Sequence, residues 1–392
     1  MSIPNVRVNN FVIEKHTLPI DIISKVYIIC EWILGVNRLP VIFNMKSILY
    51  NVLTLAFSLV FNVLTFFYIF TSNPKRLSNF VVRLSLMEYF ICSFLGFLTW
   101  KSIKSFYSEL HKFDKDIGVN WNFITYNSKC NFMQTIGTLV YLFIITMLPY
   151  QIDGLIKFWS EILTITCTHV LENYFYGHLL SLLVSRLRLI RILLLSSFTT
   201  KEEEEINSVS EKDHNSYFKN IISLNASKSK VEMKKLMQLY NNIIEAYDLL
   251  NKAIKAQILV IFSIIFVTSL TLTYNAALKI INDDYTWANG IFDVGMAVTD
   301  VVPVIVPCVF GEKIHTEVLL LRSALYSRIY KNVFDKSNRS IATSLLALTE
   351  ARTLTFSIFR MIDINITLPI KFLGLLASYL VILLQFKKVI AG

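Results

Sequence analysis

Seven stretches of the sequence are apolar enough, and long enough or nearly so, to cross a lipid bilayer. A transmembrane helix needs about 20 consecutive residues that are mostly apolar. The stretches cover residues 47–70, 84–100, 132–152, 162–187, 256–278, 287–310 and 366–386. With 54% hydrophobic residues and a mean hydropathy of +0.53, the whole chain is also more apolar than a typical soluble domain. The sequence therefore predicts an all-α polytopic membrane protein with seven transmembrane helices.

Charged residues are few, at 17% of the chain, and biased toward Lys and Arg, with 38 against 28 Asp and Glu. They lie between the apolar stretches rather than in a basic patch with interleaved aromatic residues, so the net charge of +10 does not indicate a nucleic-acid partner. Most Lys and Arg residues fall in the N-terminal segment and in every second connection after it. Because such residues stay on the cytoplasmic side, we expect a multi-pass protein of the plasma membrane, surrounded by lipid, with a cytoplasmic N-terminus and an extracellular C-terminus.

This topology divides the chain into five parts. Residues 199–230 are polar and begin with a Lys followed by four Glu residues, so we expect a disordered cytoplasmic loop. Beyond residue 231, and again in 314–330 and 341–360, apolar residues recur at helical spacing. These segments are expected to bundle into a cytoplasmic anchor; the alternative is that each lies along the membrane surface. The expected parts are the cytoplasmic N-terminal segment 1–46, transmembrane helices 1–4 in 47–198, the loop 199–230, helices 5–6 with cytoplasmic extensions and an amphipathic anchor helix in 231–365, and helix 7 with a short extracellular tail in 366–392.

Motifs of enzymes, cofactor sites and metal sites do not occur. The sequence has no Gly-rich phosphate loop, no His-Glu-x-x-His and no Gly-x-Ser-x-Gly. His169, Glu172 and His178 share one apolar stretch, where polar contacts between packed helices explain them better than metal ligation. We therefore expect no enzymatic activity, no cofactor and no metal. Ionisable residues inside the apolar stretches should face the bundle interior, a cavity or a partner; they are Glu88, Glu172, Asp293, Asp300 and Lys371.

The last apolar stretch ends in a polar residue, within Ser378-Tyr379-Leu380-Val381-Ile382-Leu383-Leu384-Gln385-Phe386. The Gln385 amide finds no hydrogen-bond partner in hydrocarbon, so it should face protein or water. Ser378, Ile382 and Gln385 share one stripe of a helix, and Phe386 borders that stripe. Several copies of this helix around an axis would enclose a water path with a hydrophobic constriction and a ring of amides that replace ion hydration. The alternative is that Gln385 bonds a neighbouring helix and Phe386 belongs to the interfacial aromatic belt.

This C-terminal pattern, a hydroxyl residue and Tyr followed by five apolar residues and Gln-Phe, resembles the signature of the insect gustatory receptors. Ser378 stands where that family usually has Thr, and Asn365 stands where it has an acidic residue. The resemblance implies a ligand-gated, nonselective cation channel that conducts as a homotetramer, with the pore lined by four copies of the seventh helix. It also implies that Ile382, Gln385 and Phe386 form the gate.

The resemblance further implies that a small-molecule tastant enters from outside into a pocket within each subunit, among the outer halves of the second to sixth helices. Aromatic side chains with a few polar groups suit such a pocket. The candidate ligand-binding residues are Tyr89, Tyr150, Thr166, His169, Asn173, Tyr274, Trp287, Phe292 and Asp293. An acidic and aromatic lining favours a cationic bitter plant metabolite through cation–π contacts, whereas a sugar would need more hydrogen-bonding groups. Packing without ligand contact is the alternative role for each residue.

Other functions fit the sequence less well. An insect odorant receptor shares the expected channel architecture, but that family's C-terminal pattern lacks this spacing from Tyr to Gln-Phe. A secondary transporter is the candidate from a different class, because Pro303 and Pro307 beside Asp293 and Asp300 are typical of a broken-helix binding site. The third apolar stretch does not end in Asp/Glu-Arg-Tyr, and no Asn-Pro-x-x-Tyr ends the seventh, so a G-protein-coupled receptor is disfavoured.

Overall fold

The computed structural model describes residues 20–42, most of 52–64, residue 67, and residues 80–117, 156–197, 232–281, 287–358 and 362–391. The third apolar stretch with Tyr150, and the polar loop 199–230, lie outside these residues.

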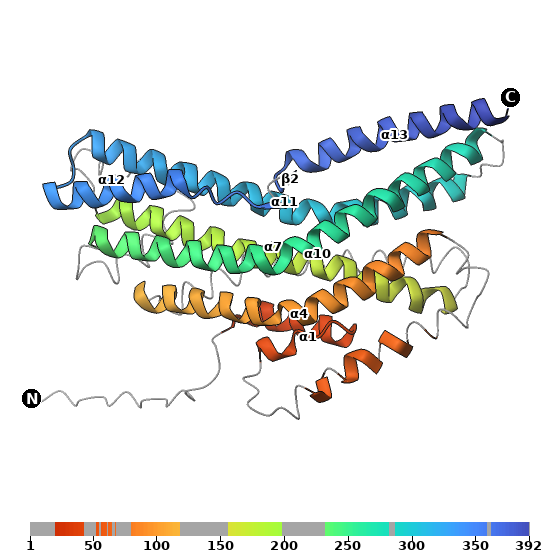
Figure 1. Ribbon diagram of the computed structural model, residues 1–392, viewed down its shortest axis with the longest axis horizontal. Helices are drawn as coiled ribbons and strands as arrows, with labels where there is room; N and C mark the ends of the chain where they lie inside the picture. The colour runs from red at the N-terminus through yellow and green to blue at the C-terminus, as the bar shows by residue number, and fades with distance from the viewer. Residues whose placement is uncertain are drawn as a thin grey trace, which may run out of the picture.

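Four long helices make up the body of the described part, and they run side by side along the long axis (Figure 1). They are α4 (Phe80–Ile117), α7 (Ile156–Ser197), α10 (Met233–Ile281) and α11 (Trp287–Tyr330). They contain between 38 and 49 residues each, which at 1.5 Å per residue is a length of about 57 to 74 Å. Since the hydrocarbon core of a bilayer is about 30 Å thick, helices of this length are longer than one crossing requires.

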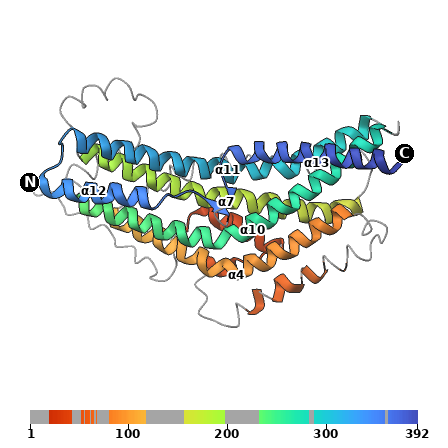
Figure 2. The ribbon, with the colours of Figure 1, turned by 45° about the horizontal axis from the view of Figure 1, so that its top comes forward.

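The shorter elements lie at the ends and along one side of this bundle. At the N-terminus, α1 (Ile22–Ile33) and the 3₁₀ turn η1 (Leu39–Val41) pack against α7 and α4. After α11 come α12 (Lys336–Ala351), the strands β1 (Ser357–Ile358) and β2 (Ile362–Asp363), and α13 (Thr367–Ala391). The two views place α12 at one end of the bundle and the C-terminal end of α13 at the other (Figures 1 and 2). The described part is therefore almost wholly helical, with one short antiparallel hairpin that pairs Ser357 with Asp363 and Ile358 with Ile362.

The N-terminal half of α10 buries the face that the sequence periodicity predicts. Its apolar residues at helical spacing are fully buried in the core: Leu236, Leu239, Ile243, Leu250 and Ile254. Burial of such a stripe, rather than helix propensity, supplies most of the stability of a helix.

The predicted helix over 341–360 is wrong at its C-terminal end. Asp335 caps the N-terminus of α12 by accepting a hydrogen bond from the backbone N–H of Asn338, but the helix ends at Ala351. Beyond it, Leu354 and Phe356 are buried while Thr353 is exposed and Thr355 is half-buried. The apolar residues thus change from helical spacing to the two-residue spacing of an extended chain.

Length and composition qualify two helical segments of the described part as membrane spans, Met233–Leu278 and Thr367–Phe386. In the most apolar part of the first segment, 44% of the residues are buried, whereas the second segment is almost wholly exposed and has Leu376 buried. The second segment, in α13, touches the bundle along one edge, where Phe266 of α10 packs edge-to-face against Phe372 and Tyr379. A membrane-length apolar helix that is this open in the single chain needs lipid or further protein around it.

The junction before α13 generates a stability prediction. A Cβ atom at Gly311 of α11 would lie in hard contact with the backbone carbonyl oxygen of Ile364, directly after β2, whereas a Cβ atom at Gly374 would meet nothing within 4 Å. Gly311→Ala should therefore destabilise the chain by about 1–3 kcal/mol, because backbone must move to admit the methyl group. Thermal unfolding of the detergent-solubilised protein measures this, and Gly374→Ala, which should unfold at the parent temperature or above, is the control. Equal unfolding temperatures of Gly311→Ala and the parent would contradict the close approach of Gly311 to the Ile364 carbonyl oxygen.

Candidate functional site

The centre of the bundle holds a fully buried arginine, Arg38. The chain leaves α1 through a turn in which Gly35 adopts a φ of 90°, a backbone region that favours glycine. In this turn the backbone N–H of Val36 donates to the carbonyl oxygen of Glu31. The turn directs the Arg38 side chain back into the bundle toward Glu31.

Arg38 connects the N-terminal segment to two of the long helices. Its Nη1 donates to Glu31 Oε1 at 2.5 Å, and its Nη2 donates to Tyr176 OH of α7 at 2.9 Å and to Gln257 Oε1 of α10 at 3.2 Å. The same Nη2 lies 3.5 Å from Glu172 Oε1 of α7. The guanidinium carbon also lies 5.2 Å from the ring centroid of Phe175, at cation–π distance. Because a buried charge is tolerated only when it is paired and hydrogen-bonded, these partners must assemble together.

The fourth long helix, α4, approaches the same residue. Gly96 faces the N-terminal segment so closely that a Cβ atom there would lie 2.7 Å from Val36 Cγ1 and 3.5 Å from Arg38 Nη2. In addition, Gln257 donates to the carbonyl oxygen of Cys92 on α4 at 3.1 Å. Arg38 and its partners thus lie where α4, α7, α10 and the N-terminal segment meet.

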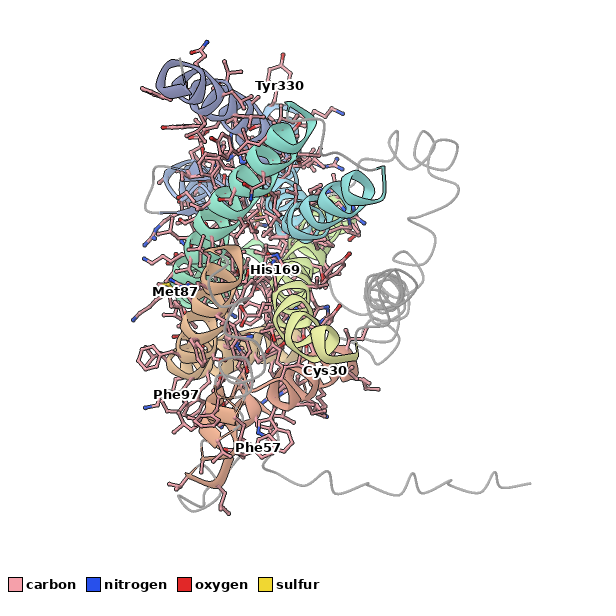
Figure 3. The ribbon with its side chains drawn as sticks, turned by 90° about the vertical axis from the view of Figure 1, so that its right-hand side faces the viewer. Cys30, Phe57, Met87, Phe97, His169 and Tyr330 are labelled. Carbon is pink, nitrogen blue, oxygen red and sulfur yellow. The ribbon has the colours of Figure 1, made fainter. Side chains whose placement is uncertain are left out.

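A second buried polar group contains two of the predicted ligand-binding residues. Nδ1 of His169 lies 2.7 Å from Glu88 Oε1 on α4, and both side chains are at most 10% exposed. Asn173, four residues further along α7, donates to the carbonyl oxygen of His169 at 2.9 Å and lies 3.5 Å from its Nε2. His169 is in the interior of the bundle, while Met87 and Tyr330 lie at its outside (Figure 3). The structure thus brings His169 and Asn173 together, as their i, i+4 spacing predicts, and adds Glu88 to them.

The other predicted ligand-binding residues are more dispersed or not described. Tyr89 is 2% exposed, and its hydroxyl donates to the carbonyl oxygen of Leu34 at 2.7 Å, so it faces the N-terminal segment. Tyr274 is half-buried on α10. The helices that carry Thr166, Trp287, Phe292 and Asp293 are described, but these four side chains are not, and Tyr150 is outside the described residues.

A third polar cluster joins α1 to α7 and α4. His178 Nε2 lies 3.1 Å from Asp21 Oδ2 and 2.9 Å from Ser24 Oγ, and Tyr107 donates to Ser24 Oγ at 2.7 Å. Ser, His and Asp also form the catalytic triad of serine hydrolases, but here Ser24 and Asp21 both contact Nε2 of His178. In a catalytic triad the serine and the aspartate bond different ring nitrogens of the histidine, so this cluster holds α1 in place rather than activating a nucleophile. No group of three or more potential metal ligands occurs among the described residues.

The predicted gate residues lie together on one side of α13. Ser378, Ile382, Gln385 and Phe386 are all exposed in the single chain. The first three follow one another at spacings of four and three residues, and their stripe lies about a quarter turn around the helix from Phe372 and Tyr379, which contact α10.

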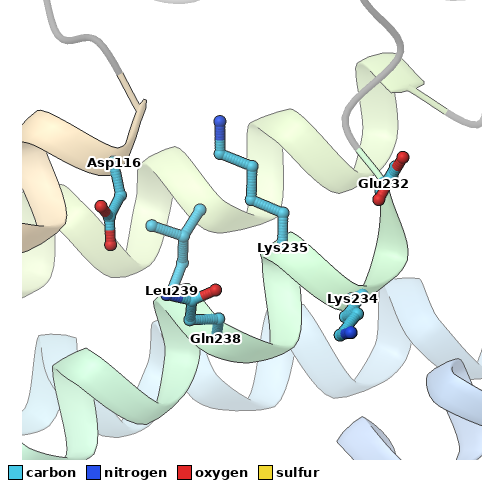
Figure 4. A pocket seen from close by; sticks show the side chains of 6 residues that line it. All are labelled: Asp116, Glu232, Lys234, Lys235, Gln238 and Leu239. Carbon is cyan, nitrogen blue, oxygen red and sulfur yellow. The ribbon is translucent and has the colours of Figure 1, made fainter.

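A polar cavity of about 360 Å³ lies where the C-terminus of α4 meets the N-terminus of α10, and it contains none of the predicted site residues (Figure 4). It is lined by Asp116, Glu232, Lys234, Lys235, Gln238 and Leu239.

Residues 29–390 match the 7tm chemosensory receptor family. The chain belongs to this family. The match confirms the family resemblance and covers nearly the whole chain, from α1 to the end of α13. Comparison with curated protein sequences gives no match.

Solved structures of this chemosensory receptor fold are also similar. The insect olfactory receptor OR5 from Machilis hrabei, in complex with eugenol, matches with a TM-score of 0.65 and 11% identity over 93% of this chain and 99% of the receptor. A second structure of the same receptor matches with a TM-score of 0.63 and 11% identity over 92% of this chain and 98% of the receptor. At this identity the likeness concerns the fold alone.

Sequence reasoning missed the Arg38 cluster of this receptor. The available signal was Glu31, a lone charged residue in the apolar run from Tyr27 to Ile33, followed seven residues later by an arginine. A carboxylate on the apolar side of a helix needs a cation nearby, and Arg38 was the nearest candidate along the chain.

Removal of the Arg38 charge should be strongly destabilising. Arg38→Met leaves Glu31 and Glu172 buried without their cation, a change that costs about 3–5 kcal/mol in comparable buried pairs. Arg38→Met combined with Glu31→Gln should regain part of that loss, because one uncompensated carboxylate is gone. Thermal unfolding in detergent measures both. Arg339→Met on the exposed surface of α12 is the control, and an Arg38→Met protein as stable as this control would exclude the assigned role.

The Asp21 cluster makes a prediction about pH. Burial alone would raise the pKa of the Asp21 carboxyl, but His178 and hydrogen bonds from Ser24 outweigh burial and lower this pKa from 3.8 to about 2. A lowered pKa in the folded state means that the stabilisation is present above pH 3.8 and is lost as the pH falls toward 2. Asp21→Asn keeps a helix-capping side chain but should cost about 2 kcal/mol at neutral pH.

The stability difference between Asp21→Asn and the parent should therefore shrink as acid is added below about pH 4. Unfolding midpoints measured from pH 7 to pH 3 test this. A difference that stays constant over this range would show that the charge of Asp21 is not the stabilising feature.

Proposed function

We propose that this chemosensory receptor is a gustatory receptor: a ligand-gated, nonselective cation channel of the plasma membrane that a small-molecule tastant opens. The observation that carries this proposal is α13, an apolar helix of membrane length that the rest of the chain leaves largely exposed, with an exposed amide, Gln385, near its end. A single such helix encloses no water path. A homotetramer with four α13 helices around an axis would surround one, and its rings of Ile382, Gln385 and Phe386 would form the gate for permeating cations.

The orientation of the proposed channel follows from the charge distribution. Lys and Arg concentrate on the face that includes the N-terminal segment, so the end of the bundle that carries α12 is assigned to the cytoplasm and Gln385 to the outer part of the membrane. The cytoplasmic parts of α10 and α11, together with α12, would form the anchor that holds the tetramer.

The polar group at His169 supports a pocket for a small molecule. A carboxylate, an imidazole and an amide are buried together at Glu88, His169 and Asn173. Buried polar groups in an apolar surround fix the orientation of a ligand, and the carboxylate favours a basic ligand, such as a bitter plant metabolite, over a sugar. The receptor of similar fold from Machilis hrabei was determined with eugenol, a small molecule.

An odorant receptor channel is the second candidate function, favoured by the likeness to an olfactory receptor fold. The spacing from Tyr379 to Gln385-Phe386 favours the gustatory assignment. The secondary transporter has less support, because α11 continues through Pro303 and Pro307 without the break that a discontinuous binding helix requires.

Gln385→Ala tests the channel proposal. The substitution should change single-channel conductance or gating severalfold while surface expression persists, because it removes the amide from the proposed conduction path. Whole-cell recordings with a panel of bitter compounds and sugars, in cells that express this chain alone, measure the currents. Leu384→Ala is the matched control, since its side chain lies at the same depth but about 100° around the helix.

Ligand-evoked currents identical in Gln385→Ala and the parent would contradict the gate assignment. So would cysteines introduced at positions 382 and 385 that never react with water-soluble thiol reagents.

A further inference from the structure

A second polar cavity, of about 620 Å³, lies between α10 and the segment that leads from α12 to α13. One wall is a stripe of α10 with Tyr247, Asn251 and Lys255 at spacings of four residues. The opposite wall belongs to the chain after α12 and to the β1–β2 hairpin, and it contributes Ala351, Arg352, Thr353, Thr355, Ser357 and Asp363. A cavity of this volume is in the range of small-ligand sites.

The walls of this cavity are held by specific contacts. Tyr247 donates to the carbonyl oxygen of Thr355 at 2.6 Å and packs edge-to-face on the buried ring of Phe356. The backbone N–H of Ile364 donates to the carbonyl oxygen of Phe356 at 2.7 Å, which closes the hairpin beneath the cavity. The two walls are therefore fixed relative to each other before any ligand arrives.

The polar groups of the cavity match an anion that also carries hydroxyl groups. Lys255 and Arg352 supply two cations, and Thr353 and Ser357 add hydroxyl groups that donate to phosphate oxygens. Asp363 provides a carboxylate that accepts hydrogen bonds from ligand hydroxyl groups, and Asn251 adds an amide side chain to the lining.

The charge balance restricts the ligand to a single phosphate. The charged residues of the lining are two cations and the Asp363 carboxylate, a net charge of +1, and Asp248 lies 3.5 Å from Arg352 Nη1 outside the cavity. This charge matches the single negative charge of a phosphodiester and is too small for a polyphosphate, whose binding sites gather more basic residues.

The cavity lies at the boundary between polar and apolar parts of the chain. Lys255 directly precedes the apolar stretch 256–278, and Asp363 comes four residues before α13 begins at Thr367. Two separate elements therefore place the cavity at the level where the apolar parts of α10 and α13 begin. In the proposed orientation, this level is the cytoplasmic surface of the membrane, where lipid headgroups lie.

We propose that this cavity binds a polyol monophosphate, the chemistry of the headgroup of phosphatidylinositol. Lys255 and Arg352 hold the phosphate, while Asp363 accepts hydrogen bonds from the ring hydroxyls. The same chemistry occurs in a soluble sugar phosphate, so the source is separated by experiment. The proposal rests on the membrane placement given above but not on channel activity.

The full chain, purified and reconstituted in phosphatidylcholine nanodiscs, is tested with phosphatidylinositol and with phosphatidylglycerol, which has the same charge and fewer hydroxyls. Native mass spectrometry of the released protein counts the retained lipid. We expect phosphatidylinositol to be retained preferentially, and its apparent affinity to fall by at least about tenfold in Lys255→Gln/Arg352→Gln, because two charge-assisted contacts are lost. Lys252→Gln/Lys336→Gln, which removes two exposed cations outside the cavity, should bind as the parent does.

Soluble myo-inositol 1-phosphate forms the second arm. If inositol phosphate displaces phosphatidylinositol from the parent protein and raises the unfolding temperature of the protein in lipid-free detergent, the site takes the soluble ligand. If only the lipid binds, the ligand comes from the membrane. Equal retention of phosphatidylinositol and phosphatidylglycerol by the parent would overturn the proposal, as would undiminished binding by the double variant. Arg352→Gln alone, at a side chain that is 60% exposed, provides a folded variant in which reduced binding is still expected.

Discussion

A guanidinium group buried in a helical bundle has to be neutralised and hydrogen-bonded, and the rest of this receptor is arranged around that requirement at Arg38. Its partners come from α1, α7 and α10, and Gly96 of α4 leaves the space that the N-terminal segment occupies. Every one of these elements has to be in register before the charge is satisfied. The cluster therefore selects one arrangement of helices whose apolar faces alone would pack in several ways.

In contrast to the buried Arg38 cluster, α13 exposes most of its apolar side chains in the single chain. Within its apolar segment Leu376 is buried, while Ile370, Val381 and Phe386 are more than half exposed. Such a surface is stable in lipid or against further copies of the chain and is unstable in water. The described part of the receptor thus combines helices that bury one another with a helix that stays largely exposed in the single chain, and the proposed tetramer would cover that helix.

Local features of this receptor were readable from the sequence, because helical periodicity records which side of a helix is buried. The stripe from Leu236 to Ile254 followed from spacing alone. Contacts between distant segments were not readable, since Arg38 meets Tyr176 138 residues away and Gln257 219 residues away, and a sequence does not record which helices become neighbours. The end of α12 was missed because its apolar residues continue into an extended segment with a different period.

In the proposed channel, α10 is the helix that would transmit the effect of a bound ligand to the gate residues of α13. Its residue Gln257 is tied to Arg38 and to α4, the helix that also provides Glu88 beside His169. Nine residues further along α10, Phe266 packs against Phe372 and Tyr379 of α13. A ligand opens a channel only by binding one arrangement of the helices more tightly than the other. In the proposed channel, a ligand beside His169 would therefore have to favour an arrangement of α4 that alters α10, and the hydrogen bonds of Arg38 and Gln257 couple these two helices.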